Sequence, residues 1–238
     1  SADMVKNEFP SVRVIRNKKN IGFSAGNNVG IRQASGTYVL LLNSDTEVGA
    51  GTIVAMLSCM QSRPDAGAAT CRLVLPDGSL DPACHRGFPT PWAALTYFLG
   101  LEKMFPRFPL FAQYHQRYKD LSAVHEIDSP SGAFFLVRKT VIDTVGLLDE
   151  DFFMYGEDLD WAYRIKQSGW KIFYNPAVSA LHRKKQSGRA NEDPNIRRRT
   201  EKHFYETMKL FYRKHYARRY GWLVTQLILL GIKLKSLV

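Results

Sequence analysis

The chain has 238 residues, of which 45% are hydrophobic and 23% are charged. These proportions are ordinary for a globular protein and exclude global intrinsic disorder, and the length allows one full domain with an appendage. The formal net charge of +11 predicts an anionic partner, which leaves nucleic acid, a phosphorylated substrate and an acidic membrane surface as candidates.

The first part of the chain alternates between strand-like and helical patterns. The patterns follow each other as strand Val12–Arg16, helix Gly22–Ser35, strand Tyr38–Leu42, helix Ile53–Met60 and strand Ala68–Leu75. Such an alternation predicts an α/β sheet whose faces are covered by helices.

A segment rich in aromatic residues and proline, from about Cys84 to Glu126, interrupts this alternation. We expect it to leave the sheet as an excursion with one short helix near Trp92–Leu101. After it, the patterns predict strand Ser131–Val137, helix Glu157–Ser168, strands Lys171–Tyr174 and Val178–Leu181, and a basic helix Arg197–His215.

Asp45 comes directly after the continuous apolar run Tyr38–Leu42, which is typical of a buried parallel strand. Ligands of open α/β sheets bind beyond the carboxyl ends of the strands. Together with Asn43, Asp45 offers the oxygen ligands that Mg²⁺ and Mn²⁺ favour and share with phosphates. The alternative is that these two residues only turn the chain.

Three acids, Glu157, Asp158 and Asp160, crowd the first turn of a predicted helix. A single acid at a helix start often serves only as a cap or as a counter-charge to the helix dipole. Glu157 and Asp158 are adjacent and follow the aromatic run Phe152–Tyr155, which is more than a cap requires. A carboxylate there is a candidate general base if an acceptor hydroxyl lies within hydrogen-bond reach.

Two further features are weaker when taken alone. The segment Asn20–Gly30 contains glycines that open a helix, and such backbone can approach a phosphate, although the spacing is not that of a dinucleotide fingerprint. His182 follows a predicted strand, where a lone histidine is more often structural than a metal ligand.

Taken in order, these segments resemble the family 2 glycosyltransferases, in particular their rhamnosyltransferase-like branch. The matching stretches are Asn20–Asn28, Tyr38–Glu47, Ser131–Phe134, Gly146–Phe153 leading into Glu157 and Asp158, and finally His182. The resemblance implies a GT-A fold, which is a Rossmann-like α/β domain with a mixed, mostly parallel sheet and helices on both faces.

The resemblance also implies roles for single residues. Asp45 is similar to the metal-binding acid of the family's DxD-type motif and would hold Mg²⁺ or Mn²⁺, with Asn43 standing where the first acid is usual. Asp158 is similar to the catalytic base, with Glu157 beside it, and His182 to a metal-binding histidine. The residues expected to contact donor or substrate are Asn20, Gly22, Phe23, Gly26, Asn27, Asn43, Gly132, Ala133 and Trp161.

The organisation of the chain departs from the family at its front. Family members begin with a strand that holds the nucleobase and a second strand with a further acid, whereas this chain is expected to start at the following helix, around Asp3–Phe9. We therefore expect the first strands to be missing from the sheet. The expected parts are a glycosyltransferase domain over residues 1–195 and a basic, amphipathic helical tail over residues 196–238.

The predicted function is inverting transfer of a sugar, with rhamnose as a candidate, from a nucleotide diphosphate sugar to a glycan or lipid-linked acceptor in cell-surface polysaccharide synthesis. One rival function, nucleic-acid binding, is disfavoured because the basic residues match no base-reading motif, so no nucleic acid partner is expected. The second rival is a non-catalytic remnant that binds sugar nucleotides or serves as a scaffold.

Lysine and arginine are concentrated between Arg183 and Arg219, and the apolar segment Trp222–Val238 follows. This segment falls short of the roughly 20 apolar residues that span a bilayer. Basic residues beside an apolar helix predict a cytoplasmic protein attached peripherally to the anionic inner face of the cell membrane. The alternative is that the last helix packs on the catalytic domain or on a second subunit of a homo-oligomer.

Overall fold

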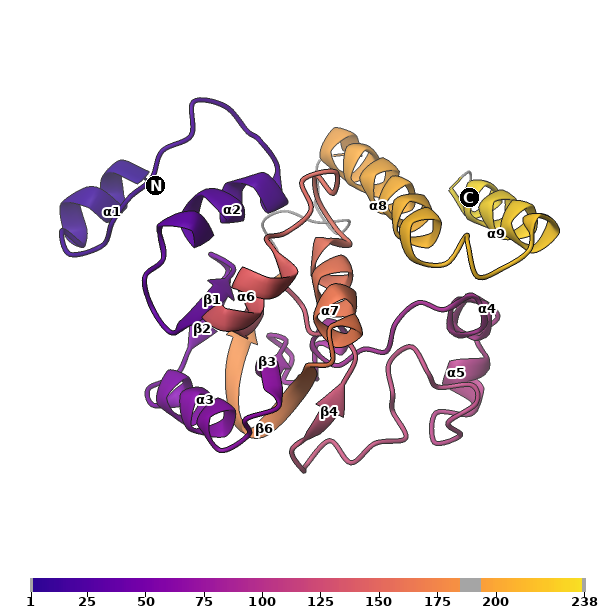
Figure 1. Cartoon of the computed structure of the whole chain (residues 1–238), viewed down its shortest axis with the longest axis horizontal. Coiled ribbons are helices and arrows are strands. Elements are labelled where there is room, and N and C mark those ends of the chain that lie inside the picture. Colours follow the sequence, from indigo (N-terminus) through magenta and orange to yellow (C-terminus); the bar gives the residue numbers. More distant parts are fainter. Residues whose placement is uncertain (1, 185–193, 237–238) are drawn as a thin grey trace.

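A mixed sheet of six strands runs through the part of the chain that the structure, a computed structural model, describes, namely residues 2–184 and 194–236 (Figure 1). The strands are β1 (Tyr38–Leu42), β2 (Thr46–Val48), β3 (Ala66–Val74), β4 (His125–Ile127), β5 (Phe134–Arg138) and β6 (Lys171–His182). Their order across the sheet is β1-β5-β3-β6-β2, and β4 also pairs with β6.

Helices occupy most of the remaining described residues. They are α1 (Ala2–Glu8), α2 (Phe23–Gln33), α3 (Thr52–Gln61), α4 (Pro91–Phe98), α5 (Leu101–Met104), α6 (Lys139–Val145), α7 (Glu157–Gln167), α8 (Pro194–His215) and α9 (Trp222–Lys235), with a 3-10 turn at Pro82–Cys84. The expected α/β class with helices on both faces is confirmed, because β3 and β5 are buried along nearly their whole length.

The strand directions correct one expectation. Among the described strand pairs, only β3 and β6 run parallel, whereas β1–β5, β3–β5, β4–β6 and β2–β6 are antiparallel. A parallel neighbour requires a crossover connection. The chain instead enters β5 from the opposite end of the sheet after the long excursion, so β5 separates β1 from β3 and opposes both.

Strand β6 joins two strands that the sequence predicts separately. Its register against β3 slips between Asn175 and Ser179, around Pro176, which has no N–H to donate to a ladder. Beyond this irregularity the strand continues to His182 and pairs with β2. The long strand therefore delivers His182 to the sheet edge that follows β1.

The prediction of a strand at Val12–Arg16 is wrong. The segment is irregular, with Val12 50% and Ile15 40% exposed. Alternating apolar residues form a stable strand only when a partner strand and a core face receive them. Within the described residues, neither is present for this segment.

Two apolar clusters hold the molecule together. The larger one joins the sheet to α2, α3, α6 and α7. The smaller one is aromatic and consists of Phe152, Tyr163, Phe211, Tyr212 and Tyr216, with Ile228 and Leu229 of α9 packed against it. Helices α8 and α9 thus dock on α7, which agrees with packing of the last helix on the catalytic domain for one of its faces.

The domain division at residue 195 stays a prediction. The basic stretch next to it includes residues 185–193, which lie outside the described residues. Among the described helices, α9 included, none combines the length and the apolar character that crossing a bilayer requires.

Candidate active site

Asp45 and His182 meet at the edge of the sheet. Asp45 lies in the short turn between β1 and β2, and the pairing of β2 with β6 places Thr46 opposite His182. The N–H of Arg183 donates to the backbone oxygen of Asp45 at 2.9 Å. His182 Nε2 consequently lies 3.4 Å from Asp45 Oδ1, and both side chains are largely buried.

A third residue, Asp81, fixes the orientation of this histidine. His182 Nδ1 lies 2.7 Å from Asp81 Oδ2, and Lys184 Nζ lies 2.7 Å from Asp81 Oδ1. Burial alone would raise the pKa of Asp81, but the hydrogen bonds from His182 and Lys184 hold that pKa well below its ordinary value. The ionised carboxylate accepts a hydrogen bond from the Nδ1–H, the tautomer that leaves the Nε2 lone pair directed at Asp45.

The donor set fits a divalent cation shared with another ligand. One carboxylate oxygen and one imidazole nitrogen suit Mn²⁺ or Mg²⁺, and a carboxylate behind a ligating histidine is the usual outer-shell partner. No group of three acidic, histidine or cysteine side chains able to hold a metal occurs within residues 2–184 and 194–236. Asp45 and His182 would supply only two ligands to a cation held here, and Mg²⁺ would need the others from elsewhere, such as a diphosphate and water.

The acidic pair begins α7 and is reached through a strained turn. Tyr155 and Gly156 both have positive φ, 69° and 80°. Asp158 Oδ2 lies 2.7 Å from Arg86 Nη2 and 3.2 Å from the backbone N of Gly132, and its Oδ1 accepts from the N–H of Leu159. A carboxylate offers about four lone-pair sites, so one position on Asp158 remains for a further donor.

The carboxyl group of Glu157 has different surroundings from that of Asp158. It is buried, and its Oε2 has no hydrogen-bond partner among the described residues. Burial and then the neighbouring charge of Asp158 raise the pKa of Glu157 above its ordinary value. Glu157 therefore holds its proton more firmly than an exposed glutamate does.

Arg86 is a site residue that the sequence analysis did not identify. Its guanidinium also donates to the backbone oxygen of Pro130 at 2.7 Å. Burial alone would lower the pKa of Arg86, but Asp158 and then Tyr114 raise it, so the guanidinium stays charged. Arg86 lies in the aromatic excursion without any recognisable motif, and no sequence signal points to it.

The backbone of Gly132 and Ala133 connects Asp158 to the turn that carries Asn43 and Asp45. Gly132 donates to Asp158, while the backbone oxygen of Ala133 accepts from the N–H of Asn43 at 3.3 Å. A Cβ added at Gly132 would lie 3.3 Å from the ring of Phe23. The structure therefore brings Phe23, Asn43, Gly132 and Ala133 together between the Asp45–His182 pair and the acidic pair.

The glycine-containing segment has structural roles that the sequence did not reveal. Gly22 has a φ of 89°, and a Cβ there would lie 2.7 Å from Phe153. Asn20 accepts from the N–H of Gly22, and Asn27 donates to the backbone oxygen of Phe23. Gly26 has open space where a Cβ would be. Donor contacts by Asn20, Gly22, Gly26 and Asn27 stay a prediction.

Trp161 does not lie where the sequence analysis expects a residue that contacts donor or substrate. It is fully buried in the main core, where its ring packs edge-on against Phe135 and its Nε1 donates to the backbone oxygen of Gly146. Position 161 lies one helical turn beyond Glu157 and Asp158, where the side chain packs into the main core. Its side chain therefore stabilises the core and does not line the site.

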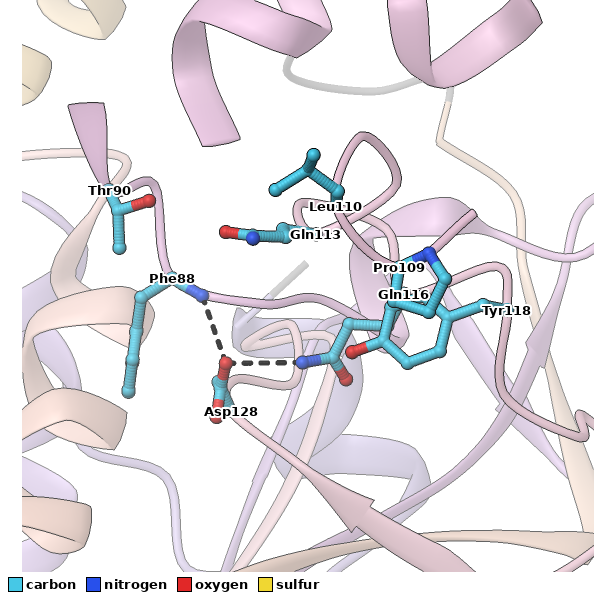
Figure 2. Close-up of a pocket in the computed structure, with 8 residues that line it drawn as sticks. All are labelled: Phe88, Thr90, Pro109, Leu110, Gln113, Gln116, Tyr118 and Asp128. Atoms are coloured by element: carbon cyan, nitrogen blue, oxygen red, sulfur yellow. Dashed lines mark hydrogen bonds between the residues drawn. The ribbon is translucent and has the colours of Figure 1, made fainter. Parts of the chain in front are cut away.

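A pocket of about 420 Å³ opens beside Arg86, where the excursion folds back on the sheet (Figure 2). It is lined by Phe88, Thr90, Pro109, Leu110, Gln113, Gln116, Tyr118 and Asp128. Asp128 Oδ2 accepts from the N–H of Phe88 at 3.3 Å and from Gln116 Nε2 at 3.1 Å (Figure 2). Arg86, two residues before Phe88, connects this pocket to Asp158.

Comparison with solved structures defines the class of fold. A crystal structure of GalNAc-T7 with UDP, GalNAc and Mn²⁺ superposes with a TM-score of 0.55 at 16% identity, over 88% of this chain and 40% of that one. At this identity the likeness shows the fold alone, and that fold is of the GT-A type.

Comparison with sequences shows the family. The family model described as glycosyltransferase like family 2 matches residues 1–217, and the chain belongs to that family. It is 30% identical over 190 residues to the N-acetylglucosaminyl-diphospho-decaprenol L-rhamnosyltransferase of Mycobacterium tuberculosis, covering 75% of this chain and 61% of the relative. It is 27% identical over 169 residues to rhamnosyltransferase WbbL of Escherichia coli, covering 68% and 60%.

The resemblance to the rhamnosyltransferase-like branch is thereby confirmed. The chain spans about three fifths of the length of these two relatives. A further relative, the O-antigen biosynthesis protein RfbC of Myxococcus xanthus, is 27% identical over 174 residues, which cover 72% of this chain and 13% of that protein.

Proposed function

We propose that the protein is an inverting, metal-dependent glycosyltransferase of cell-surface polysaccharide synthesis. It would move a sugar, with rhamnose as the first candidate, from a nucleotide diphosphate sugar to a glycan or a lipid-linked saccharide. The observation that carries the proposal is the continuous set of contacts from His182 and Asp45 through Asn43 and Gly132 to Asp158. The choice of sugar and acceptor class rests on the two relatives named as rhamnosyltransferases.

In this proposal Asp158 removes the proton from the acceptor hydroxyl, at the lone-pair position that its three protein donors leave open. Arg86 positions the carboxylate through an ion pair in a largely buried site. Glu157, whose pKa is raised, holds its proton and so limits the negative charge beside Asp158. The member of the pair with an open acceptor position is thus the one proposed as the base.

Asp45 and His182 would hold Mg²⁺ or Mn²⁺. When bound, the cation would supply Lewis-acid neutralisation of the leaving diphosphate. The protein's own contribution is the fixed imidazole tautomer, since Asp81 engages Nδ1 and directs Nε2 toward Asp45.

We also propose that the protein attaches peripherally to the anionic cytoplasmic face of the membrane. Support comes from α9, whose outer side chains are exposed, and from the basic residues that precede it. Such a location suits a lipid-linked acceptor, the class of substrate that the name of the Mycobacterium tuberculosis relative describes for that protein.

The proposal is tested by titrating the full-length protein with a nucleoside diphosphate, with and without Mn²⁺, in a calorimeter. Asp45→Asn should abolish the Mn²⁺-dependent part of the affinity while leaving the fold intact, and His182→Ala should weaken it less because one of several ligands is lost. Asp77→Asn, an exposed acid in the turn after β3, is the matched control. Unchanged Mn²⁺-dependent affinity in Asp45→Asn would reject the metal site.

A further inference from the structure

Exposed apolar side chains gather in two segments of the chain. Of the twenty-five large hydrophobic residues that are exposed among the described ones, nine lie between positions 92 and 110 and seven between positions 220 and 234. The most exposed are Leu99 and Met104 in the first segment, at 62% and 68%, and Trp222 in the second, at 72%. Isolated exposed apolar residues are normal, but a concentration of this kind marks an interaction surface.

The second segment, α9, is docked by one face only. Ile228 and Leu229 pack against the aromatic cluster, and Thr225 is hydrogen-bonded to the hydroxyl of Tyr212 at 3.1 Å. The opposite face carries Leu223, Leu227, Leu230 and Leu234, all exposed. These positions recur every three or four residues and therefore form one apolar stripe along the helix.

The first segment, residues 91–111, is an ordered excursion and not a loose loop. Trp92 Nε1 donates to the backbone oxygen of Leu110 at 2.8 Å, and the ring of Phe111 packs against those of Phe105 and Phe108. The fold thus fixes these rings to one another while leaving Phe105 45% and Phe108 53% exposed. An apolar surface held in place this way loses little conformational freedom when it binds.

The two segments lie on the same side of the molecule, α4 and α5 below α9 in the view of Figure 1. The aromatic cluster connects them, because Phe88 packs on it together with Ile228 and Leu229. Phe88 is three residues before the start of α4. The two segments are therefore joined through one cluster, as a partner that contacts both would require.

Charge identifies the partner. The sequence has no Asp or Glu after Glu206, and between Pro82 and Lys119 it has only Glu102, which is buried and bonded to His115 at 2.8 Å. Exposed Lys103 and Arg107 accompany the first segment, and exposed Lys233 and Lys235 the second. A second copy of the same surface would place like charges against each other, whereas an anionic lipid surface complements them.

We propose that residues 91–111 and the outer face of α9 form one two-part membrane-binding surface for anionic lipid, in which the excursion contributes as much as the C-terminal helix. Helix α9 has 14 residues and would be about 21 Å long at 1.5 Å per residue, and the proposal places it along the bilayer interface. The inference deepens the peripheral location proposed above and requires none of the catalytic roles.

Flotation of the full chain with vesicles tests this surface. Phosphatidylcholine vesicles with and without phosphatidylglycerol are compared at low and high salt. Wild-type protein should float with the anionic vesicles, less so at high salt. The double variant Leu99→Glu/Met104→Glu should lower the floated fraction several-fold, and so should Leu227→Glu/Leu230→Glu or a chain that ends at Tyr220.

The matched control is Ile53→Glu/Val54→Glu, which changes two exposed apolar residues of α3 and should float like wild type. Flotation of Leu99→Glu/Met104→Glu at the wild-type level would overturn the two-part surface. A dimer in light scattering that the same variant dissociates would overturn it in favour of contact between two copies. Mn²⁺-dependent nucleotide binding, measured on each variant, should not change, so failure here is distinguishable from failure of the catalytic proposal.

Discussion

Two carboxylates on the first turn of α7, Asp160 and Asp158, show how differently one helix can use the same chemical group. Asp160 is fully buried and accepts from Arg164 of its own helix and from Lys214 and His215 at the end of α8, at 2.6 to 2.8 Å. Asp158 has one cationic partner, Arg86, and two backbone donors. A carboxylate surrounded by protein cations joins helices, whereas one with an open acceptor position can receive a substrate hydroxyl.

The largest expected effect is on turnover and concerns Asp158, the carboxylate with an open acceptor position. Asp158→Asn in the full-length protein should lower turnover by about 10² to 10⁴, because removal of a general base typically costs that much. Donor affinity should be spared, since the nucleotide is proposed to bind at Asp45 and His182. Transfer of labelled sugar to acceptor, together with nucleotide titration, measures both. Glu157→Gln should cost less, and an inactive Glu157→Gln beside an active Asp158→Asn would place the base one residue earlier.

Substitution of Asp160, the enclosed carboxylate, should lower the free energy of unfolding. Asp160→Asn leaves Arg164, Lys214 and His215 without their shared anion, and breaking a buried ion pair costs about 3 to 5 kcal/mol of unfolding free energy. Denaturant titration measures the loss, with Asp143→Asn, an exposed acid on α6, as control. A variant as stable as wild type would show that this cluster does not hold α8 on α7.

The pH dependence of the same residue has a defined sign. Burial alone would raise the pKa of Asp160, but the hydrogen bond from His215, the charge of Arg164 and the hydrogen bond from Lys214 lower it from 3.8 to about 2. Because the pKa is lower in the folded state, the stabilisation is complete above the unfolded pKa and is lost as pH falls toward about 2. The Asn variant should lack this part of the acid-induced loss.

A smaller effect, on metal affinity, is expected for Asp81, which contacts the proposed metal ligand His182. Asp81→Asn removes the charge that holds the Nδ1 proton of His182, and loss of such an outer-shell partner costs about 10- to 100-fold in metal affinity. Nucleotide binding without metal should stay unchanged. Competition with a coloured chelator gives the Mn²⁺ affinity, and a value equal to that of wild type would leave Asp81 with a purely structural role.

Local patterns predicted much of the fold. Tyr38–Leu42 forms a strand with the predicted bounds, and α7 begins at Glu157 as its acidic first turn indicates. The strand directions were not predictable in the same way, because apolar runs do not record whether a neighbour runs parallel. Short strands such as β2 and β4, three residues each, have too little pattern to be recognised.

The residues of the candidate site divide in the same way into those that local patterns predict and those that they do not. Asp45, His182 and the acidic pair stand at the ends of predicted elements, where sequence reasoning looks for ligands. Asp81 and Arg86 act through contacts across 101 and 72 residues of chain, and neither lies in a motif. Trp161 shows the converse error, because a side chain one helical turn beyond Asp158 can pack in the core beneath the site without lining it.

The way α2 is held has a consequence for synthesis on the ribosome. Asn28 exchanges hydrogen bonds with the backbone of Leu148, and Ser24 donates to the backbone oxygen of Phe152, across 120 and 128 residues of chain. At about 5 to 20 residues per second, roughly 6 to 24 s separate the emergence of α2 from that of its partners. A helix of 11 residues with two glycines is not stable alone. In the nascent chain α2 therefore stays unfolded until Phe152 leaves the exit tunnel.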